Sequence, residues 1–517
     1  MKDKIKNILK KVIVYIPILN KLYFQRSLLR TSVHELSQKV LEDEKEIERL
    51  KFVISETKTT VDNQEEVLVM SKLVIERLKG LLADSYFQLH FLPKLNISKV
   101  SKSQVHSRKL ENVLTINQGD KGGAAKVALR LADSLSQDNY KVDILLGENE
   151  FALKGNIHLV QREYSEVQSF LKEFQKDSSW DDLLNFSSER IKDLQIFKNA
   201  DVIHFHNLQG AGGYFSLFDL VELSTLKPTV WTLHDMLSVV GDWKYYLEAN
   251  EWDKKGINFP YTNPEYEDMT ESAKFNLKAK QLIYEKIDTS IVCPAQWLVD
   301  KLKDSVLKDK EVHLIHNGIE ETIFKPYNKD SVRKELGLPV DKKILLFQAN
   351  SGKYNVWKGP EYLDRALQYF KSRDDIIFLN IGGDDIVEPG WVNISYINDE
   401  ETMSKYFSAA DIFIYPSLAD ICPLTVLEAQ SCGLPVVAFK TGGVPEIVSH
   451  METGYVSGYK DTADFIKGID LLLKDSDLRL KLSFNSRKNI ISEFTLDKMK
   501  NKYIKVYEEA IWKKSSR

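Results

Sequence analysis

Two carboxylates separated by seven residues give the most specific chemical signal in the sequence. Asp420 follows a strand-like segment at 412–415, and Glu428 is expected on the opening turn of the next helix. Carboxylates in these places can accept hydrogen bonds from sugar and ribose hydroxyls, while the amides of the intervening loop face a diphosphate. The alternative is a loop aspartate that caps its helix and a glutamate in a surface ion pair. The motifs described below favour the first interpretation.

A glycine pair, Gly122-Gly123, stands between an expected strand at 113–116 and an expected helix at 124–135. Residues without side chains let backbone N–H groups approach a phosphate at a helix N-terminus, where the helix dipole favours negative charge. A glycine pair in a tight strand-to-helix turn is equally compatible with a purely structural role. This motif alone is therefore a weak indication of a phosphate site.

Histidines and aromatic residues follow two further expected strands. His204-Phe205-His206-Asn207 ends one strand, so His206 and Asn207 could touch an acceptor molecule. Trp243 follows the segment 231–236 in an aromatic stretch that could form an acceptor wall, because aromatic rings stack on sugars. Histidines at a strand end are also common packing residues, and aromatic clusters are common in cores. Both alternatives stay open on the sequence alone.

Short apolar strands alternate with helical stretches from about residue 110 onward, which indicates parallel, doubly wound sheets. The expected strands of a first half are 113–116, 142–146, 202–206, 229–233, 289–293 and 312–316, and those of a second half are 343–347, 376–380, 392–396, 412–415 and 435–439. Open α/β sheets bind ligands at the carboxyl ends of their strands. Two such halves in tandem predict one cleft between them that holds the site.

The composition is that of a globular protein with two or three folded units. The chain has 517 residues, of which 43% are hydrophobic and 28% charged, and a formal net charge of -4. That charge argues against nucleic acid as the main partner. Cys293, Cys422 and Cys432 are too few and too isolated for a disulfide framework or a zinc site, which fits a reducing compartment. No apolar run approaches the ~20 residues needed to span a bilayer.

Residues 1–25 read as a basic amphipathic segment. On a helix, the lysines between Lys2 and Lys11 would flank an apolar stripe that runs from Ile5 to Ile16. Such a helix can lie in the headgroup region of a membrane, with its lysines drawn to anionic lipid. The alternative is a helix docked on the protein's own body.

Residues 26–100 carry a heptad pattern. Every seventh position is aliphatic, namely Val33, Val40, Ile47, Ile54, Val61, Leu68, Ile75 and Leu82. β-branched residues at this position, with leucine on the alternate seam, favour two parallel strands, so we predict a coiled-coil homodimer. Polar residues such as Asp43 and Gln64 interrupt the alternate seam. The alternatives are a long helix folded back on the globular part of the chain and a bent hairpin near Ser55 to Asn63.

Several motifs together resemble the family 4 glycosyltransferases, retaining enzymes of the two-domain GT-B fold, over roughly residues 110 to 515. Asp420 and Glu428 match the family's two-carboxylate motif, which is usually written with glutamate at both ends. The other matching segments are the glycine loop at 122–132, the histidine at 234, the interdomain linker at 316–326, the phosphate loop at 352–359, and the segments 432–437 and 441–446.

The resemblance implies a role for each matching residue. As catalytic residues it implies His234 and Asp420 at the donor sugar and Glu428 at the nucleotide ribose. The donor-binding set it implies is Gly122, Gly123, Lys353, Lys358, Leu424, Thr425 and Glu428. The two lysines would neutralise the departing diphosphate, and that phosphate would take the proton of the attacking acceptor hydroxyl. No protein nucleophile, cofactor or metal ion is then implied.

Two departures from the family pattern make the donor harder to name. Asp420 is one methylene shorter than the usual glutamate, so its contacts with a donor sugar could differ. Lys353 stands where the family commonly has arginine, and lysine cannot make a bidentate fork to phosphate.

The predicted fold class is α/β, with two tandem Rossmann-like domains. We expect an acceptor domain at 109–325, a nucleotide-sugar domain at 326–495, and a final helix at 496–517 that packs back towards the first domain. A helical and coiled-coil region precedes them. The expected location is the cytoplasm, at the inner face of the membrane.

The predicted function is transfer of a hexosyl group from a nucleotide sugar, with retention, to a glycan or lipid-linked acceptor in cell-surface polysaccharide or glycolipid synthesis. One alternative is an inactive glycosyltransferase-like scaffold or partner subunit, which the coiled coil favours and which the presence of His234, Lys358 and Glu428 disfavours. Another is a GT-B sugar-nucleotide epimerase, which the linker and the two-carboxylate segment disfavour.

Overall fold

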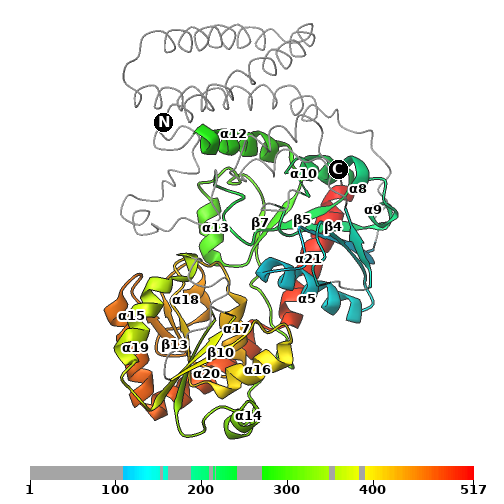
Figure 1. Ribbon diagram of the computed structural model, residues 1–517. Helices are drawn as coiled ribbons and strands as arrows, with labels where there is room; N and C mark the ends of the chain where they lie inside the picture. Colours follow the sequence, from blue (N-terminus) through cyan, green and yellow to red (C-terminus); the bar gives the residue numbers. More distant parts are fainter. Residues whose placement is uncertain are drawn as a thin grey trace, which may run out of the picture. The chain divides into compact units, whose positions relative to one another are not determined.

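The computed structural model describes residues 109–151, 155–160, 188–208, 214–215, 217–240, 271–348, 356–382 and 390–516 (Figure 1). The segments predicted at 1–25 and 26–100 lie outside the described residues, as do Lys353 and Trp243. The chain divides into two compact units. The described part of one is helix α12 (Glu271–Lys286), and the other contains two parallel sheets.

The first sheet has seven parallel strands within the described residues, in the order β3-β2-β1-β4-β5-β6-β7. They are β1 (Asn112–Asn117), β2 (Lys141–Leu146), β3 (Ile157–Leu159), β4 (Val202–Phe205), β5 (Thr229–Thr232), β6 (Ser290–Cys293) and β7 (Val312–Leu314). The central strands are almost wholly buried, as expected for a parallel sheet covered on both faces. The strand order reverses between β1 and β4, and ligands bind at such switch points.

The helices of this domain, within the described residues, are α5 (Gly123–Gln137), α8 (Ser188–Ile191), α9 (Gln195–Asn199), α10 (Leu217–Leu226) and α13 (Gln296–Leu302). Helix α5 buries Val127, Leu131 and Leu135, which recur every four residues, together with the neighbouring Ala128, and these side chains form one apolar face. That face packs against β1 and β2, so the start of the helix is held at the carboxyl end of β1.

The second sheet has six parallel strands within the described residues, in the order β10-β9-β8-β11-β12-β13. They are β8 (Lys343–Gln348), β9 (Ile376–Ile381), β10 (Trp391–Ile394), β11 (Ile412–Tyr415), β12 (Val436–Phe439) and β13 (Gly454–Ser457). The helices are α14 (Lys329–Glu335), η4 (Val356–Lys358), α15 (Pro360–Phe370), α16 (Glu400–Ala409), α17 (Leu424–Ser431), α18 (Val444–Ile447), α19 (Thr462–Lys474) and α20 (Ser476–Glu493). Leu345, Phe378 and Ile414 of the strands pack with Phe465 and Leu472 of α19 in its core.

The last helix, α21 (Leu496–Ser515), packs against α5, β4 and β5 of the first domain, where Figure 1 shows it in red. The chain therefore crosses between the domains twice. The two crossings run side by side, because Ile319 N donates to Phe494 O at 2.9 Å and Leu496 N donates to Ile319 O at 2.8 Å. Gly318 lies at this contact, where a Cβ would stand 2.7 Å from Thr495 O, so only glycine fits.

The tandem parallel sheets predicted from the sequence are confirmed. The prediction was wrong in omitting β3 and β13. β3 has only three residues, with Leu159 58% exposed, and β13 begins with a glycine, so neither shows a run of buried apolar residues.

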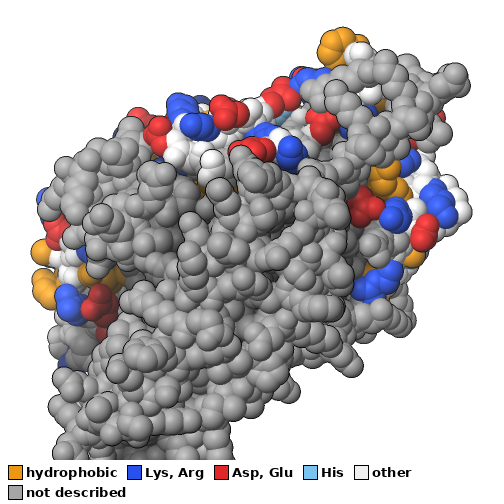
Figure 2. Space-filling view, turned by 90° about the horizontal axis from the view of Figure 1, so that it is seen from above, with side chains coloured by type: hydrophobic (Ala, Val, Ile, Leu, Met, Phe, Trp, Pro, Cys, Tyr) orange, Lys and Arg blue, Asp and Glu red, His pale blue; other side chains and the backbone are white. Residues whose placement is uncertain are grey.

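The described surface carries charges of both signs, and the described helices differ from a membrane span in length or apolar character. On the face seen in Figure 2, acidic and basic side chains of the described residues are interspersed, in keeping with 71 Lys and Arg against 75 Asp and Glu. Among the helices that the structure describes, none combines the length and apolar character needed to cross a bilayer.

Candidate active site

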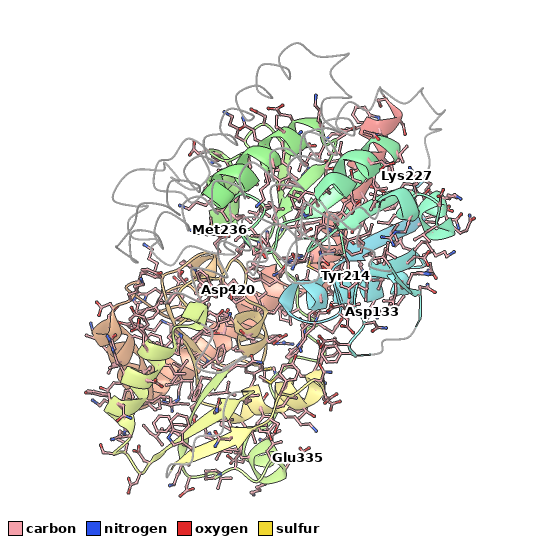
Figure 3. The ribbon with its side chains drawn as sticks, turned by 45° about the horizontal axis from the view of Figure 1, so that its top comes forward. Asp133, Tyr214, Lys227, Met236, Glu335 and Asp420 are labelled. Atoms are coloured by element: carbon pink, nitrogen blue, oxygen red, sulfur yellow. The ribbon has the colours of Figure 1, made fainter. Side chains whose placement is uncertain are left out.

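The main cavity, of ≈ 560 Å³, lies between the carboxyl ends of the two sheets. Eight of the residues predicted for the site line it: Gly122, Gly123, Asn207, His234, Lys358, Asp420, Leu424 and Thr425. Figure 3 shows Asp420 at the edge of the second domain that faces the first. The fold thus brings together residues from both halves of the chain.

Two helix N-termini open into this cavity. Gly122 is the N-cap residue of α5, and Pro423 is that of α17, and in neither case does a side chain cap the helix. Gly123 at the start of α5 and Leu424 and Thr425 at the start of α17 line the cavity. Uncapped first-turn amides carry partial positive charge, so both helices favour an anionic ligand here.

Gly122 requires the absence of a side chain for its backbone conformation. Its φ of 94° lies in the left-handed region that L-residues with a side chain rarely adopt. A Cβ at Gly122 or at Gly123 would meet nothing within 4 Å, so the space beside them is open. The glycine pair therefore leaves room for a ligand at the start of α5.

Lys358, Asp420 and Tyr415 form a hydrogen-bonded cluster on the second-domain side. Lys358 Nζ donates to Asp420 Oδ2 at 2.8 Å and to Tyr415 Oη at 3.2 Å, and Tyr415 Oη donates to Asp420 Oδ2 at 2.7 Å. Burial alone would lower the pKa of Lys358, but the negative charge of Asp420 raises it above its usual value. Burial, reinforced by Asp420, raises the pKa of the Tyr415 hydroxyl. The lysine is therefore a permanent cation and the tyrosine a permanent donor.

Backbone contacts fix the loop that carries Asp420. A Cβ on Gly442 would collide with the Asp420 carbonyl oxygen, and one on Gly443 would collide with the carbonyl oxygen of Ile421. Thr441 Oγ1 donates to Leu418 O at 2.8 Å. These close approaches explain why the segment 441–443 contains two glycines beside the carboxylate.

The first-domain side of the cavity presents a neutral, half-buried histidine with buried histidines behind it. His234, which lines the cavity, is held by His206, with 2.9 Å between His234 Nε2 and His206 Nδ1. Burial lowers the pKa of His234 to about 4, and burial also lowers the pKa of His206 well below its usual value. Both imidazoles are therefore neutral near pH 7.

A second layer of hydrogen bonds lies behind these rings. His204 Nε2 is 2.8 Å from Thr232 Oγ1, and His204 Nδ1 is 2.7 Å from Tyr507 Oη of α21. Tyr503, also on α21, has its hydroxyl 2.9 Å from Thr232 Oγ1. The final helix of the chain thus supports the histidine cluster, a connection that no local sequence pattern indicated.

His206 does not line the cavity as the acceptor prediction requires. It is 1% exposed, and its described contacts place it behind His234. Asn207 does line the cavity, and its backbone is fixed by a 2.9 Å hydrogen bond from Asn207 N to Asn117 Oδ1. Trp243, the third residue predicted to bind the acceptor, lies outside the described residues.

Glu428 lies one turn into α17 rather than on its opening turn, because the helix begins at Leu424. It does not line the main cavity but a neighbouring one of ≈ 100 Å³, which shares Gly122, Gly123, Leu424 and Thr425 with it. Glu428 Oε1 accepts a 2.7 Å hydrogen bond from Arg130 Nη2, a residue of α5 that sequence reasoning missed.

A possible cation-binding group lies away from this cavity. Glu311, His313 and Glu509 have ligand atoms within 4.8 Å of one another. Lys513 already forms an ion pair with Glu311, so one of the two carboxylates of this group has a cation partner within the protein.

Comparisons with known proteins agree with this architecture. The profile for "Glycosyltransferase Family 4" matches residues 121–322, and that for "Glycosyl transferases group 1" matches residues 328–489. The N-acetyl-alpha-D-glucosaminyl L-malate synthase of Bacillus anthracis is 22% identical over 223 residues, which are 41% of this chain and 58% of that protein.

Solved structures share the fold of both sheet domains. A sucrose-phosphate synthase from Thermosynechococcus elongatus superposes with a TM-score of 0.58 at 18% identity, covering 77% of this chain and 98% of that one. Anabaena HepE in complex with UDP and glucose superposes with a TM-score of 0.54 at 15% identity, covering 76% of this chain and 98% of that one.

The match to curated relatives is partial. The aligned region spans 58% of the Bacillus synthase and 46% of the D-inositol 3-phosphate glycosyltransferase of Mycobacteroides abscessus, to which it is 27% identical, and covers 36% of this chain. The two profiles nevertheless match both sheet domains in order, one on each side of the linker. The chain belongs to the family 4 glycosyltransferases, with the GT-B arrangement of two parallel α/β domains.

Proposed function

We propose that the protein is an active, retaining glycosyltransferase that moves a hexosyl group from a nucleotide sugar to a glycan or lipid-linked acceptor in cell-surface polysaccharide or glycolipid synthesis. One observation carries the proposal. Two uncapped helix N-termini and Lys358 converge on one cavity that also contains a carboxylate and a neutral histidine.

The cavity suits a sugar diphosphate because its charges are divided. The starts of α5 and α17, with Lys358, offer positive potential to phosphate oxygens. Asp420 offers an anionic acceptor to sugar hydroxyls, and its present partners, Lys358 and Tyr415, keep it in place. A donor would share Lys358 with Asp420, so that the lysine bridges the sugar side and the phosphate side.

The same geometry supports departure of the diphosphate. Negative charge grows on the leaving phosphate in the transition state, where fixed dipoles and a fixed cation stabilise it most. His234 is neutral near pH 7, since burial lowers its pKa to about 4, and it can hydrogen-bond a sugar hydroxyl without adding charge. We infer that the acceptor hydroxyl attacks on the face that the phosphate leaves and gives its proton to that phosphate. In this scheme neither a protein nucleophile nor a metal ion takes part.

Nucleoside diphosphate release tests this proposal. The full-length protein should release nucleoside diphosphate from one member of a panel of sugar nucleotides, and faster with a glycan or lipid-linked acceptor than without. Proton NMR of the first product should show the anomeric configuration of the donor. A product with the inverted anomeric configuration would contradict the proposal. So would the absence of nucleoside diphosphate release with every donor in the panel.

We also propose that residues 1–100 determine location and assembly rather than chemistry. The lysine-flanked stripe at 2–16 would hold the protein at the cytoplasmic face of an anionic membrane, and the heptads from Val33 to Leu82 would make it a homodimer. A protein truncated to begin at Ser101 should be monomeric by light scattering, should not float with anionic vesicles, and should keep turnover of a soluble acceptor analogue. A truncated protein that stays dimeric would show that the heptads are not the interface.

A further inference from the structure

An arginine of the first domain reaches into the second. Arg130 of α5 donates from Nη2 to Glu428 Oε1 of α17 at 2.7 Å and to Glu400 Oε1 of α16 at 2.6 Å, and from Nε to the same Glu400 oxygen at 3.0 Å. Its guanidinium also lies over the ring of Phe324 in the interdomain linker, 5.3 Å from the ring centroid. The Arg130 side chain therefore connects α5 of the first domain to α16 and α17 of the second domain and to the interdomain linker.

These groups are largely withdrawn from solvent. The side chains of Arg130 and Glu428 are 9% and 4% exposed, and that of Glu400 is 28% exposed. Burial alone would lower the pKa of Arg130, but Glu428 and Glu400 raise it, so it stays charged. Without Arg130, the Glu428 carboxylate would be buried with no cation beside it, and an uncompensated buried charge is strongly unfavourable. Arg130 is therefore the cation that compensates the Glu428 carboxylate at this place.

The arrangement is not optimised for stability alone. Arg130 Nη1 is buried and has no hydrogen-bond partner among the described residues, which is uncommon for a purely structural ion pair. Arg130 uses only Oε1 of Glu428, and no hydrogen bond to Oε2 is formed within the described part of the chain. Glu428 also lines the smaller cavity, so one carboxylate oxygen is left for a ligand hydroxyl there.

We propose that Arg130 is a positioning residue that completes the ribose site from the opposite domain, by holding the Glu428 carboxylate oriented towards the smaller cavity. This inference rests on the proposed function, in which Glu428 accepts hydrogen bonds from the ribose. Arg130 itself need not touch the nucleotide. Because Arg130 and Glu428 belong to different domains, recognition of the ribose depends on an arrangement of the two domains in which this ion pair is formed.

Binding of nucleotides with and without ribose hydroxyls tests the inference directly. Calorimetric titrations measure the affinity of each protein for UDP, GDP and ADP and for the 2′,3′-dideoxy analogue of each. The affinity for the ribonucleotide divided by that for its dideoxy analogue gives the contribution of the ribose hydroxyls. The wild type should bind its preferred ribonucleotide about tenfold or more tightly than the dideoxy form, since a hydrogen bond to a carboxylate is lost. Arg130→Gln should reduce that ratio to near one and leave dideoxynucleotide affinity almost unchanged.

Two variants separate positioning from general destabilisation. Arg333→Gln removes another buried arginine, which pairs with Asp411 inside the second domain, and should lower the melting temperature with no change in the ratio. Arg130→Lys keeps one positive charge but cannot fork between two carboxylates, so an intermediate ratio is expected. It also replaces Arg130→Gln as the test if the glutamine variant does not fold.

The outcomes are distinguishable. A wild-type ratio retained in Arg130→Gln, or in Arg130→Lys if only that variant folds, would overturn the role of Arg130. A ratio that Glu428→Gln also leaves unchanged would show that Glu428 is not the ribose carboxylate. A wild type that binds none of these nucleotides would overturn the proposed function itself.

Discussion

The two sides of the cavity are built from different chemistry. On the second-domain side, ionised groups occur in close pairs: Lys358 with Asp420, and Glu428 with an arginine from the other domain. On the first-domain side, His234 and the buried rings behind it are neutral, and hydroxyl groups of α21 support them. Apart from Lys121 and Asp235, which also line the cavity on the first-domain side, the fold therefore separates the ion pairs of the site from its neutral hydrogen-bond network.

This difference predicts different responses to substitution. A charged group placed where charge develops in the reaction contributes most in the transition state, so its loss should affect turnover strongly. A neutral hydrogen-bond network mainly sets the orientation of one ring, so its loss should affect turnover less and stability more. The predictions below run from the largest expected effect to the smallest.

Lys358→Ala should lower transfer by about 100-fold or more, because it removes the cation beside the departing phosphate. Lys121→Ala is the matched control. Lys121 lines the same cavity, but it is 64% exposed at the side chain and paired with Glu150, so its loss should cost less than about fivefold. Initial rates of nucleoside diphosphate release measure both. An equal loss of activity in the two variants would mean that the position of the lysine relative to Asp420 does not matter.

His234→Ala should lower turnover by about tenfold, an effect of one neutral hydrogen bond and the shape it provides. His206→Gln removes the ring that orients His234 and should have a smaller effect, about threefold, seen in kcat more than in KM. The pH profile of both variants should match that of the wild type between pH 6 and 8, since the pKa of His234 is about 4 and the ring does not titrate there. This prediction would be contradicted if the activity of the wild type changed with pH near 6.5 and His234→Ala abolished that change.

Acid should destabilise the first domain through its histidines. The pKa values of His204, His206 and His234 are lowered by burial in the folded protein, while in the unfolded chain they return to about 6.5. Below pH 6.5 the unfolded state therefore binds more protons, and the free energy of unfolding falls as pH falls. Each histidine contributes about 1 kcal/mol of this loss between pH 6.5 and 5.5, because the unfolded imidazole is only half protonated at pH 6.5.

Removing one histidine should flatten that dependence. His204→Gln should reduce the fall in unfolding free energy over this interval by about 1 kcal/mol relative to the wild type. Urea denaturation at a series of pH values measures it. An unchanged slope would mean that His204 takes up its proton in the folded state.

Tyr507→Phe should have the smallest effect, a loss of about 1 kcal/mol in unfolding free energy, because it removes one hydrogen bond to His204 and fills the same space. Activity should change by less than about twofold, since His204 does not line the cavity. Tyr503→Phe offers a parallel test at Thr232. A large loss of activity with unchanged stability would show that α21 acts on the chemistry directly.

Several features of this protein were readable from local sequence. Apolar strands alternating with amphipathic helices predicted two parallel sheets, because burial on both faces requires continuous apolar strands. The resemblance to the family 4 glycosyltransferases implied that Gly122, Gly123, Lys358, Asp420 and Thr425 share a site, and the structure places all five at one cavity. These motifs and periodic patterns involve residues that are close in the sequence, so they can be recognised without knowing how the chain packs.

Only the tertiary structure decided which side chains act on one another. Arg130 and Glu428 are 298 positions apart, and no periodicity links them. The sequence left open whether His206 touches the acceptor or packs inside the protein. In the structure His206 is buried behind His234, because β4 and β5 are neighbouring strands and the residues that follow them lie side by side. The partners Tyr503 and Tyr507 are supplied by a helix that returns from the second domain. Such contacts depend on how two sheets and a returning helix pack, and that packing is a property of the whole chain.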